Sequence, residues 1–332
     1  MVLEHTGAYR RLHRGKLLIL LYHRVLAEPS EEQGFLLPSI TTSAAAFEDN
    51  MIYLRQHYTM LSFEEFFRLE REQRWDRAKH YAMVTFDDGW VDGHTFAFPV
   101  LKRLHIPAAF FICTGVVGTR DSFWWYELLE VLARRRGQPG FDEALATLVG
   151  SSVLAVAILQ RFQKALYGQR FMLALQQLAN LIMEQPSGQV ADFIKAWRGG
   201  GKPADFESMT LSWPQIREMS EAGMSFGPHT IRHAILPRIA EEDALCEIRD
   251  SWQNLLAQEG VHTTPVFSYP SGTFDARTQA MVRDCGLQAA LAVDQRANAL
   301  PLRDPFAISR VNVDRRSSES PALFKLLLAR SR

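Results

Sequence analysis

Two adjacent carboxylates are the first residues that could do chemistry. Asp87 and Asp88 follow the apolar segment Tyr81–Phe86 and precede Gly89. Successive side chains of a strand point to opposite faces, so both carboxylates can serve one site only if the chain turns here, which a glycine permits. The same residue types also favour turns, so a helix N-cap or an Asx-turn explains this motif equally well when it is taken alone.

A pair of histidines is the second candidate. His229 and His233 are four residues apart, a spacing that places both rings on one face of a helical turn and within reach of one metal ion. In a chain with ten histidines such a pair can arise by chance on the surface. The apolar segment Met224–Gly227 before them favours a functional interpretation, because it places them at the end of a predicted strand.

Two histidines and one carboxylate form a facial triad that binds a divalent cation and leaves coordination positions open for water and substrate. The carboxylate that remains can accept the proton of the attacking water, whose pKa the metal lowers. The combination therefore predicts a metal-assisted amidase or esterase.

The elements that would position these groups alternate along the chain. Short apolar strands are separated by longer stretches of helical periodicity, which is typical of a parallel sheet or barrel. The predicted strands are Lys16–Tyr22, Tyr81–Phe86, Ala108–Thr114, Met224–Gly227, Val266–Tyr269 and Gln288–Val293. Catalytic groups of a barrel lie at the carboxyl ends of its strands, where both motifs fall.

Helices are predicted between these strands. They are Ser43–His57, Glu64–Gln73 with a capping box from Ser62 and Glu65, Thr95–Leu104, Trp213–Ala222 with Ser212 as N-cap, Ala240–Glu259 and Thr278–Cys285. The region from about 121 to 207 differs, because it lacks strand-like alternation and is rich in Leu, Ala, Gln and Arg. We expect it to be a helical subdomain inserted into a single barrel domain spanning residues 1–332, packed over one rim of the barrel.

Composition excludes several classes of function. The 37 basic and 37 acidic side chains give zero net charge, so no whole-chain argument supports binding to nucleic acid or an anionic membrane. Cys113, Cys246 and Cys285 lie far apart and predict neither a disulfide framework nor a thiolate metal site. No stretch approaches the roughly 18 apolar residues of a membrane helix. The run Leu17–Leu21 is too short for the core of a secretion signal, so we expect a cytoplasmic protein of open oligomeric state.

The motifs resemble those of a known family. Thr85–Gly89 and His229–His233 look like the two signature motifs of the polysaccharide deacetylases, which are carbohydrate esterase family four with the NodB-homology fold. Further similar segments are Leu20–Val25, Phe98–Lys102, Ile106–Phe111, Phe267–Gly272 and Phe306–Val313. The insertion, which begins Phe123-Trp124-Trp125, is similar to that of a branch linked to exopolysaccharide synthesis.

This resemblance implies a distorted (β/α) barrel with seven strands and a divalent metal, usually Zn²⁺, with Co²⁺, Ni²⁺ and Fe²⁺ as alternatives. The implied reaction removes acetyl groups from an N-acetylated sugar, in a polysaccharide, an oligosaccharide or a precursor. Asp87 matches the general base, and the matched metal ligands are Asp88, His229 and His233. A backbone N–H near the third motif, at Tyr269, Ser271 or Gly272, would stabilise the oxyanion together with the metal.

The sequence departs from the family pattern at two places. Ser268 occupies the position of an arginine that orients the catalytic aspartate; Arg310 could reach the same carboxylate from another strand, although an ordinary ion pair at the barrel rim fits equally well. After His262 there is no histidine to act as the usual general acid. His23, which ends the opening strand on the same rim, is our candidate for that role, with a structural hydrogen bond as the alternative.

Aromatic side chains with polar tips are candidates for stacking on sugar rings, and we single out Trp90, Trp125 and Tyr269. For Trp125 the alternative is anchoring of the insertion.

Two other functions compete with deacetylation. A related barrel amidohydrolase would act on a small cyclic amide or imide, and a decayed barrel would only bind carbohydrate. The missing arginine and histidine support decay, whereas the complete ligand set favours an enzyme.

Overall fold

Parallel strands in sequence order form the larger of two compact units. The computed structural model describes residues 13–27, 37–119, 123–165, 169–198 and 209–331. The first unit, the barrel unit, comprises Met1–Pro29, Ser39–Thr119 and Glu207–Arg332. The second unit comprises Ser30–Pro38 and Arg120–Phe206.

The strands of the barrel unit pair with their neighbours in register. β1 (Lys16–Tyr22) pairs in parallel with β5 (Tyr81–Phe86), β5 pairs with β6 (Ala108–Ile112), and β6 pairs with β7 (Ser225–Pro228). On its other side β1 pairs in parallel with β11 (Val311–Asn312). This part of the sheet holds both sequence motifs at its carboxyl edge.

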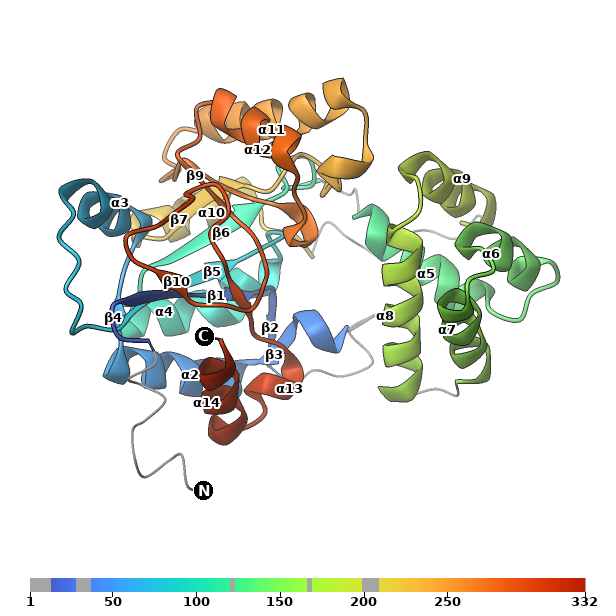
Figure 1. The fold of residues 1–332 in the computed structure, drawn as a ribbon, viewed down its shortest axis with the longest axis horizontal. Helices are drawn as coiled ribbons and strands as arrows, with labels where there is room; N and C mark the ends of the chain where they lie inside the picture. Colours follow the sequence, from blue (N-terminus) through green and yellow to red (C-terminus); the bar gives the residue numbers. More distant parts are fainter. Residues whose placement is uncertain (1–12, 28–36, 120–122, 166–168, 199–208, 332) are drawn as a thin grey trace. The chain divides into compact units, whose positions relative to one another are not determined.

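Two further strands close the ring. β8 (Val266–Ser268) and β9 (Ala289–Leu291) form their own parallel pair. A bridge from β7 to Thr263 joins this pair on one side, and a bridge from β9 to Ile308 joins it on the other. Among the described residues, seven parallel strands therefore follow one another around a barrel that is interrupted on both sides of the β8–β9 pair (Figure 1). The predicted distorted barrel is confirmed.

Alternation of side chains divides the apolar strand residues between two clusters. One cluster fills the barrel and takes Leu17, Ile19, Tyr81, Met83, Ala109, Phe111, Val266, Ala289, Leu291 and Ile308. Their strand neighbours point outward, and Leu18, Leu20, Val84, Phe86 and Phe110 pack under helices. Because both faces of these strands are buried, the strands read as continuous apolar runs in the sequence.

The described helices of the barrel unit are α2 (Ala44–His57), α3 (Phe63–Glu72), α4 (Phe98–Leu104), α10 (Trp213–Glu221), α11 (Glu241–Leu256), α12 (Ala276–Asp284), α13 (Arg315–Ser318) and α14 (Pro321–Arg330). The predicted capping box of Ser62 and Glu65 is present. The helix predicted from Thr95 is instead a π-helical segment, Gly93–Ala97, followed by α4. Pro99 explains the break, since a proline in the first turn of α4 has no N–H for a regular helical bond.

Several short strands were not predicted, because they have too few residues to show a period. β2 (Arg24–Leu26) pairs in parallel with β3 (Thr41–Ser43), and β4 (Thr59–Met60) extends the sheet beside β5. β10 (Asn298–Ala299) pairs with β1 in antiparallel orientation. β2 continues directly from the end of β1 and therefore lies beside the candidate site.

The second unit is helical, as predicted. It contains α5 (Trp124–Arg135), α6 (Phe141–Val149), α7 (Val153–Lys164), α8 (Gln169–Met183) and α9 (Ser187–Trp197). Its fully buried side chains include Leu128, Leu132, Phe141, Leu145, Phe162 and Leu178. Residues 121–122, 166–168 and 199–207 of the predicted insertion lie outside the described residues, and its packing over the barrel rim stays a prediction. No helix in the described ranges combines the length and the apolar character needed to span a bilayer.

One buried histidine ties the N-terminal end of the barrel unit to its C-terminal end. His13 Nε2 lies 3.1 Å from the Ser331 carbonyl oxygen, which can only accept, so His13 Nδ1 accepts from the Tyr58 hydroxyl at 3.0 Å. Burial lowers the pKa of His13 below its usual 6.5. The stability that neutral His13 contributes is therefore complete above pH 6.5 and decreases as the pH falls below it.

We expect His13→Phe to lower the free energy of unfolding at pH 8 by about 1–3 kcal/mol, because two buried polar groups lose their partner. The difference from wild type should shrink at pH 5.5, where the wild type has lost part of the contribution of His13. Denaturant unfolding at both pH values measures it, with His105→Asn at an exposed position as control. A difference that does not change with pH would contradict this role.

Candidate active site

The inward-facing positions of the barrel strands continue into polar residues at the carboxyl ends. In β5 the inward series runs through Met83 to Asp87, and in β8 it runs from Val266 to Ser268. The same alternation after Ile308 points Arg310 inward, and after Gly227 it points His229 inward. A Cβ on Gly227 would lie 2.5 Å from the Phe111 ring, which confirms how closely this side of the barrel is packed.

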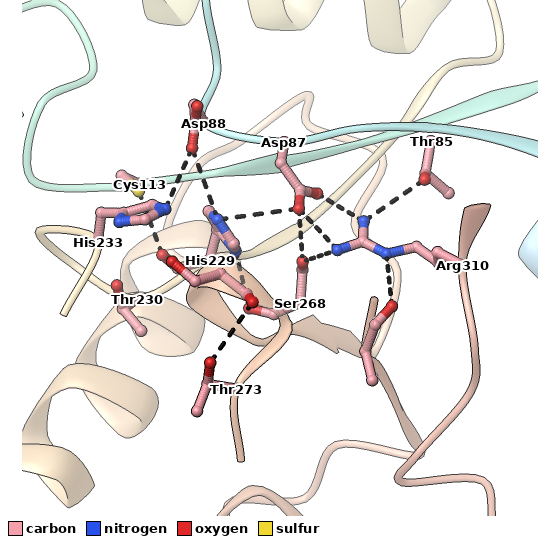
Figure 2. Close-up of polar contacts among 12 residues, drawn as sticks. Thr85, Asp87, Asp88, Cys113, His229, Thr230, His233, Ser268, Thr273 and Arg310 are labelled. Carbon is pink, nitrogen blue, oxygen red and sulfur yellow. Dashed lines mark hydrogen bonds and ion pairs between the residues drawn. The ribbon is translucent and has the colours of Figure 1, made fainter. Parts of the chain in front are cut away.

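Asp87 is held by a buried arginine. Arg310 Nη1 donates to Asp87 Oδ1 and Arg310 Nη2 donates to Asp87 Oδ2, both at 2.7 Å. The Ser268 hydroxyl donates to Asp87 Oδ2 at 3.0 Å and accepts from Arg310 Nη2 at 2.8 Å. Arg310 is fully buried, and Figure 2 shows its guanidinium facing the carboxylate. The contact between Arg310 and Asp87 that the sequence suggested is therefore present.

Asp88 turns away from this pair. Its backbone lies in the left-handed region with φ 73°, and Gly89 follows with φ 86°. These two residues supply the turn that the sequence required if both carboxylates were to face one site. Asp88 Oδ2 accepts a hydrogen bond from Trp90 Nε1 at 2.9 Å. Asp88 Oδ1 is buried and accepts no hydrogen bond within the described part of the chain.

The two histidines lie on a loop with an unusual backbone. Thr230 and His233 both have positive φ, 66° and 59°, so the segment is a tight turn and not a helix. Glu247 of α11 accepts hydrogen bonds from the backbone N–H groups of Ile231 at 2.8 Å and Arg232 at 3.1 Å. These bonds offset the strain of the loop and fix the separation of the rings, whose centroids are 5.0 Å apart.

Asp88, His229 and His233 form a group that could hold a metal ion, with one ligand atom from each and all three atoms within 4.8 Å of one another. The Nε2 atoms of His229 and His233 lie 3.6 and 3.5 Å from Asp88 Oδ1. Donors about 2.1 Å from a tetrahedral zinc ion lie roughly 3.4 Å apart, so these separations suit a divalent cation.

The chemistry of the donors also fits a cation. His229 Nδ1 donates to the Ser268 carbonyl oxygen at 2.8 Å, so the neutral ring has its lone pair on Nε2, facing the centre of the group (Figure 2). Burial lowers the pKa of His229, but the charges of Asp87 and Asp88 raise it above its ordinary value, and a bound cation would replace that proton. The unbonded Asp88 Oδ1 offers a negative oxygen at the same point. A buried carboxylate oxygen without a partner is costly in an apolar interior, and a bound cation would supply that partner.

The charges of the site shift the pKa values of its members. Burial alone would raise the pKa of Asp88, but His229, His233 and His23 lower it below its ordinary value. Burial would also raise the pKa of Asp87, and Arg310 and His229 reverse that effect. Burial lowers the pKa of His233 to about 4. Both carboxylates are therefore ionised and His233 is neutral at neutral pH, as ligand binding requires.

His23 lies at the same end of the barrel, directly after the last residue of β1. The charges of Asp88 and Asp87 raise its pKa, but burial has the larger effect and lowers it. His23 Nδ1 is buried and has no hydrogen-bond partner among the described residues. The structural hydrogen bond considered for His23 is thus absent at this atom.

Two residues expected to stack on sugar rings are buried, which contradicts that expectation. Tyr269 is 0% exposed and donates its hydroxyl to the Phe306 carbonyl oxygen at 3.2 Å. Strand alternation is the reason, since Tyr269 follows inward-facing Ser268 and so points outward into the cluster under α11 and α12. Trp90 is 1% exposed and packs beneath Asp88.

The remaining substrate-binding candidates occupy different places. Trp125 is buried in the second unit and stacks on Phe123 with ring centroids 5.5 Å apart. The N–H of Gly272 donates to the Tyr269 carbonyl oxygen at 2.8 Å, and the N–H of Tyr269 donates to Leu291 at 3.1 Å. Both are therefore engaged within the fold. Ser271, which is exposed and has φ 56°, stays the candidate for an oxyanion donor.

Two supporting residues were missed as members of the site. Ser268 contacts Asp87, Arg310 and His229, yet a serine in a strand gives no distinctive signal, and only the absent arginine marked its position. Glu247 supports the histidine loop from the middle of α11, where a glutamate is indistinguishable in sequence from a solvated helix face.

A barrel of parallel strands with a buried Asp-His-His group at their carboxyl ends places the protein among barrel proteins with a candidate metal site. Comparison with models of protein families identifies the family within this class. The family model described as polysaccharide deacetylase matches residues 75–142 and 186–290, just over half of the chain. The chain belongs to the polysaccharide deacetylase family, as the sequence motifs indicated. No curated protein sequence gives a significant match.

Solved structures share the fold. The Streptococcus pyogenes deacetylase PplD in complex with acetate is 18% identical, with a TM-score of 0.60 over 96% of this chain and 99% of that one. IcaB from Ammonifex degensii is 20% identical, with a TM-score of 0.57 over 95% and 97%. A de-N-acetylase from Aggregatibacter actinomycetemcomitans is 14% identical, with a TM-score of 0.58 over 94% and 99%.

We expect Arg310→Gln to lower the free energy of unfolding by about 3–5 kcal/mol, because it leaves the buried Asp87 carboxylate without its counter-ion. The double variant Asp87→Asn with Arg310→Gln should recover part of that loss, since the unpaired charge is gone. A double-mutant cycle from denaturant unfolding measures the coupling. Additive losses would show that the two side chains act independently.

Proposed function

We propose that the protein is a metal-dependent hydrolase that removes N-acetyl groups from an N-acetylated sugar of the N-acetylglucosamine type, in a polysaccharide, an oligosaccharide or a precursor. One observation carries the proposal. Asp88 converges with His229 and His233, while the adjacent Asp87 stays outside that group, ionised and fixed by Arg310. A protein that only binds carbohydrate does not need one carboxylate in a metal-ligand group and a second, ionised carboxylate fixed beside it. Family membership supports the choice of substrate.

Asp88, His229 and His233 would hold the metal, with zinc as the first candidate and Co²⁺, Ni²⁺ or Fe²⁺ as alternatives. A divalent cation there would act as a Lewis acid toward water and toward the acetyl carbonyl oxygen. Asp87 Oδ2 lies 3.9 Å from His229 Nε2, so the base is next to the ligand group without belonging to it.

Asp87 accepts the proton of the attacking water in this proposal. Arg310 and Ser268 hold the carboxylate in one orientation, which favours proton transfer in the reactive geometry. The lowered pKa keeps Asp87 ionised at neutral pH but makes it a weaker base. The contacts with Arg310 and Ser268 therefore orient Asp87 and keep it ionised, but they also lower its basicity.

His23 donates a proton to the leaving amine. Its position at the end of β1, among the charges of both carboxylates, supports this role. Its Nδ1 has no hydrogen-bond partner among the described residues. The protonated fraction of His23 declines as the pH rises, and because burial lowers its pKa this decline begins at a lower pH than for an ordinary histidine. A deacetylation rate limited by His23 should therefore fall toward alkaline pH.

Acetate release from chito-oligosaccharides by the zinc-loaded protein tests the function. We expect Asp87→Asn to lower kcat by about 10²–10⁴-fold, because it removes the base, and His229→Ala to abolish release together with metal binding. Asp284→Asn and His105→Asn, at exposed positions of the same unit, are the matched controls. Bound metal without release from any N-acetylated sugar would favour a small cyclic amide as substrate. A protein that binds no metal would contradict the proposal.

A separate comparison tests His23. We expect His23→Asn to lower kcat by about 10²-fold and to remove the alkaline decline from the pH profile. A variant that keeps the profile of the wild type would show that Asp87 carries the proton both ways.

A further inference from the structure

Trp90 contacts the candidate ligand Asp88 from the side opposite the histidines. Its indole Nε1–H donates to Asp88 Oδ2 at 2.9 Å, while Asp88 Oδ1 faces the Nε2 atoms of His229 and His233. The two oxygens of one carboxylate are thus divided between a hydrogen bond and the candidate metal position. Trp90 is 1% exposed, and tryptophan is rarely buried so completely.

The indole ring is itself held in place. The guanidinium carbon of Arg24 lies 4.6 Å from the centroid of the Trp90 ring, a cation–π contact. Arg24 Nε donates to Asp92 Oδ2 at 2.8 Å, and Asp92 Oδ1 accepts from the Val25 N–H at 2.9 Å. Arg24 and Asp92 are both buried. The pair therefore fastens the start of β2 to the loop that carries Trp90 and Asp88.

The backbone on either side of Trp90 is fixed as well. The Leu211 N–H donates to the Gly89 carbonyl oxygen, and the Val91 N–H donates to the Met209 carbonyl oxygen, both at 2.8 Å. Trp90 and Thr210 form an antiparallel bridge between these bonds. The loop after β5 therefore has little freedom to change its conformation when a metal ion binds to Asp88.

From these contacts we infer that Trp90 is a positioning residue for the metal site. Its N–H holds Asp88 in the orientation that presents a single oxygen, Oδ1, to the metal, and the Arg24–Asp92 pair keeps the indole in that place. The inference rests on the proposed function, because it assigns a role toward the metal that Asp88, His229 and His233 would bind. Hydrogen bonds to ligands of this kind typically change metal affinity by about 10–100-fold.

A phenylalanine at position 90 separates this role from packing. Trp90→Phe keeps an aromatic ring under Arg24 but removes the N–H, which leaves Asp88 Oδ2 buried and unbonded. The barrel offers a matched control, since Trp75 Nε1 donates to Glu70 Oε2 at 2.7 Å, outside the candidate site. Trp75→Phe therefore removes the same kind of bond without touching a ligand.

The experiment measures Zn²⁺ affinity by competition with a chromophoric chelator, the visible absorption of the Co²⁺-loaded full-length protein, and the thermal unfolding of the metal-free protein. We expect Trp90→Phe to weaken Zn²⁺ binding by about 10–100-fold and to change the Co²⁺ spectrum. Trp75→Phe should match wild type in both, although both variants lower the unfolding temperature.

The other outcomes distinguish a failure of the positioning role of Trp90 from a failure of the proposed function. Equal Zn²⁺ affinity of wild type and Trp90→Phe, or equal losses in both tryptophan variants, would overturn the positioning role while the metal site stands. A wild-type protein that binds no Zn²⁺ or Co²⁺ would instead overturn the proposed function.

If Trp90→Phe does not fold, nuclear magnetic resonance of the ¹⁵N-labelled indole groups in the unaltered protein tests the same point. We expect one of the seven tryptophan N–H signals to exchange slowly with solvent and to shift when Zn²⁺ is added. No such signal would overturn the inference.

Discussion

The buried ion pair between Arg310 and Asp87 determines how the site can work. Two carboxylates next to each other in sequence would otherwise compete for the same cation and repel each other when both are ionised. Arg310 neutralises one of them, Asp87, with two hydrogen bonds of 2.7 Å and holds it outside the Asp-His-His group. Asp88 can then complete the Asp-His-His group with Oδ1, which accepts no hydrogen bond from the described residues.

The barrel makes this arrangement possible through the alternation of its strands. Asp87, Ser268 and Arg310 occupy inward positions that continue the apolar series inside the barrel, so three different strands, β5, β8 and β11, bring side chains to one point. Only Asp88 breaks the alternation, and it does so through its left-handed backbone and Gly89. The strain of this turn is local, because the flanking strands are fully buried and paired.

The sequence predicted the parts of the fold that repeat and the parts of the site that form local motifs. β1 and β5 have the predicted bounds, and Asp88, His229 and His233 converge as the motifs indicated. The histidines converge although the helical turn predicted from their spacing is instead a loop with positive φ at Thr230 and His233. The contact of Arg310 with Asp87 was one of two open alternatives, since 223 residues separate the two and only the closed barrel brings them together.

Other features could not be derived from the sequence for identifiable reasons. Tyr269 was assigned to the substrate because aromatic side chains with polar tips often stack on sugar rings, but strand alternation turns it into the core. Trp90 was expected on a surface, yet its indole N–H donates to the candidate metal ligand Asp88. The Arg24 and Asp92 side chains that hold the ring in place come from different elements. The supporting side chains of the site depend on tertiary packing, which leaves no periodic signal in the chain.

A crystal structure with zinc, phased at the zinc absorption edge, tests whether the two adjacent carboxylates have separate roles. We expect one anomalous peak at about 2.0–2.2 Å from Asp88 Oδ1 and from the Nε2 atoms of His229 and His233. Asp87 should remain paired with Arg310. A zinc ion bound to Asp87, or one that lies away from the two histidines, would contradict this division of roles.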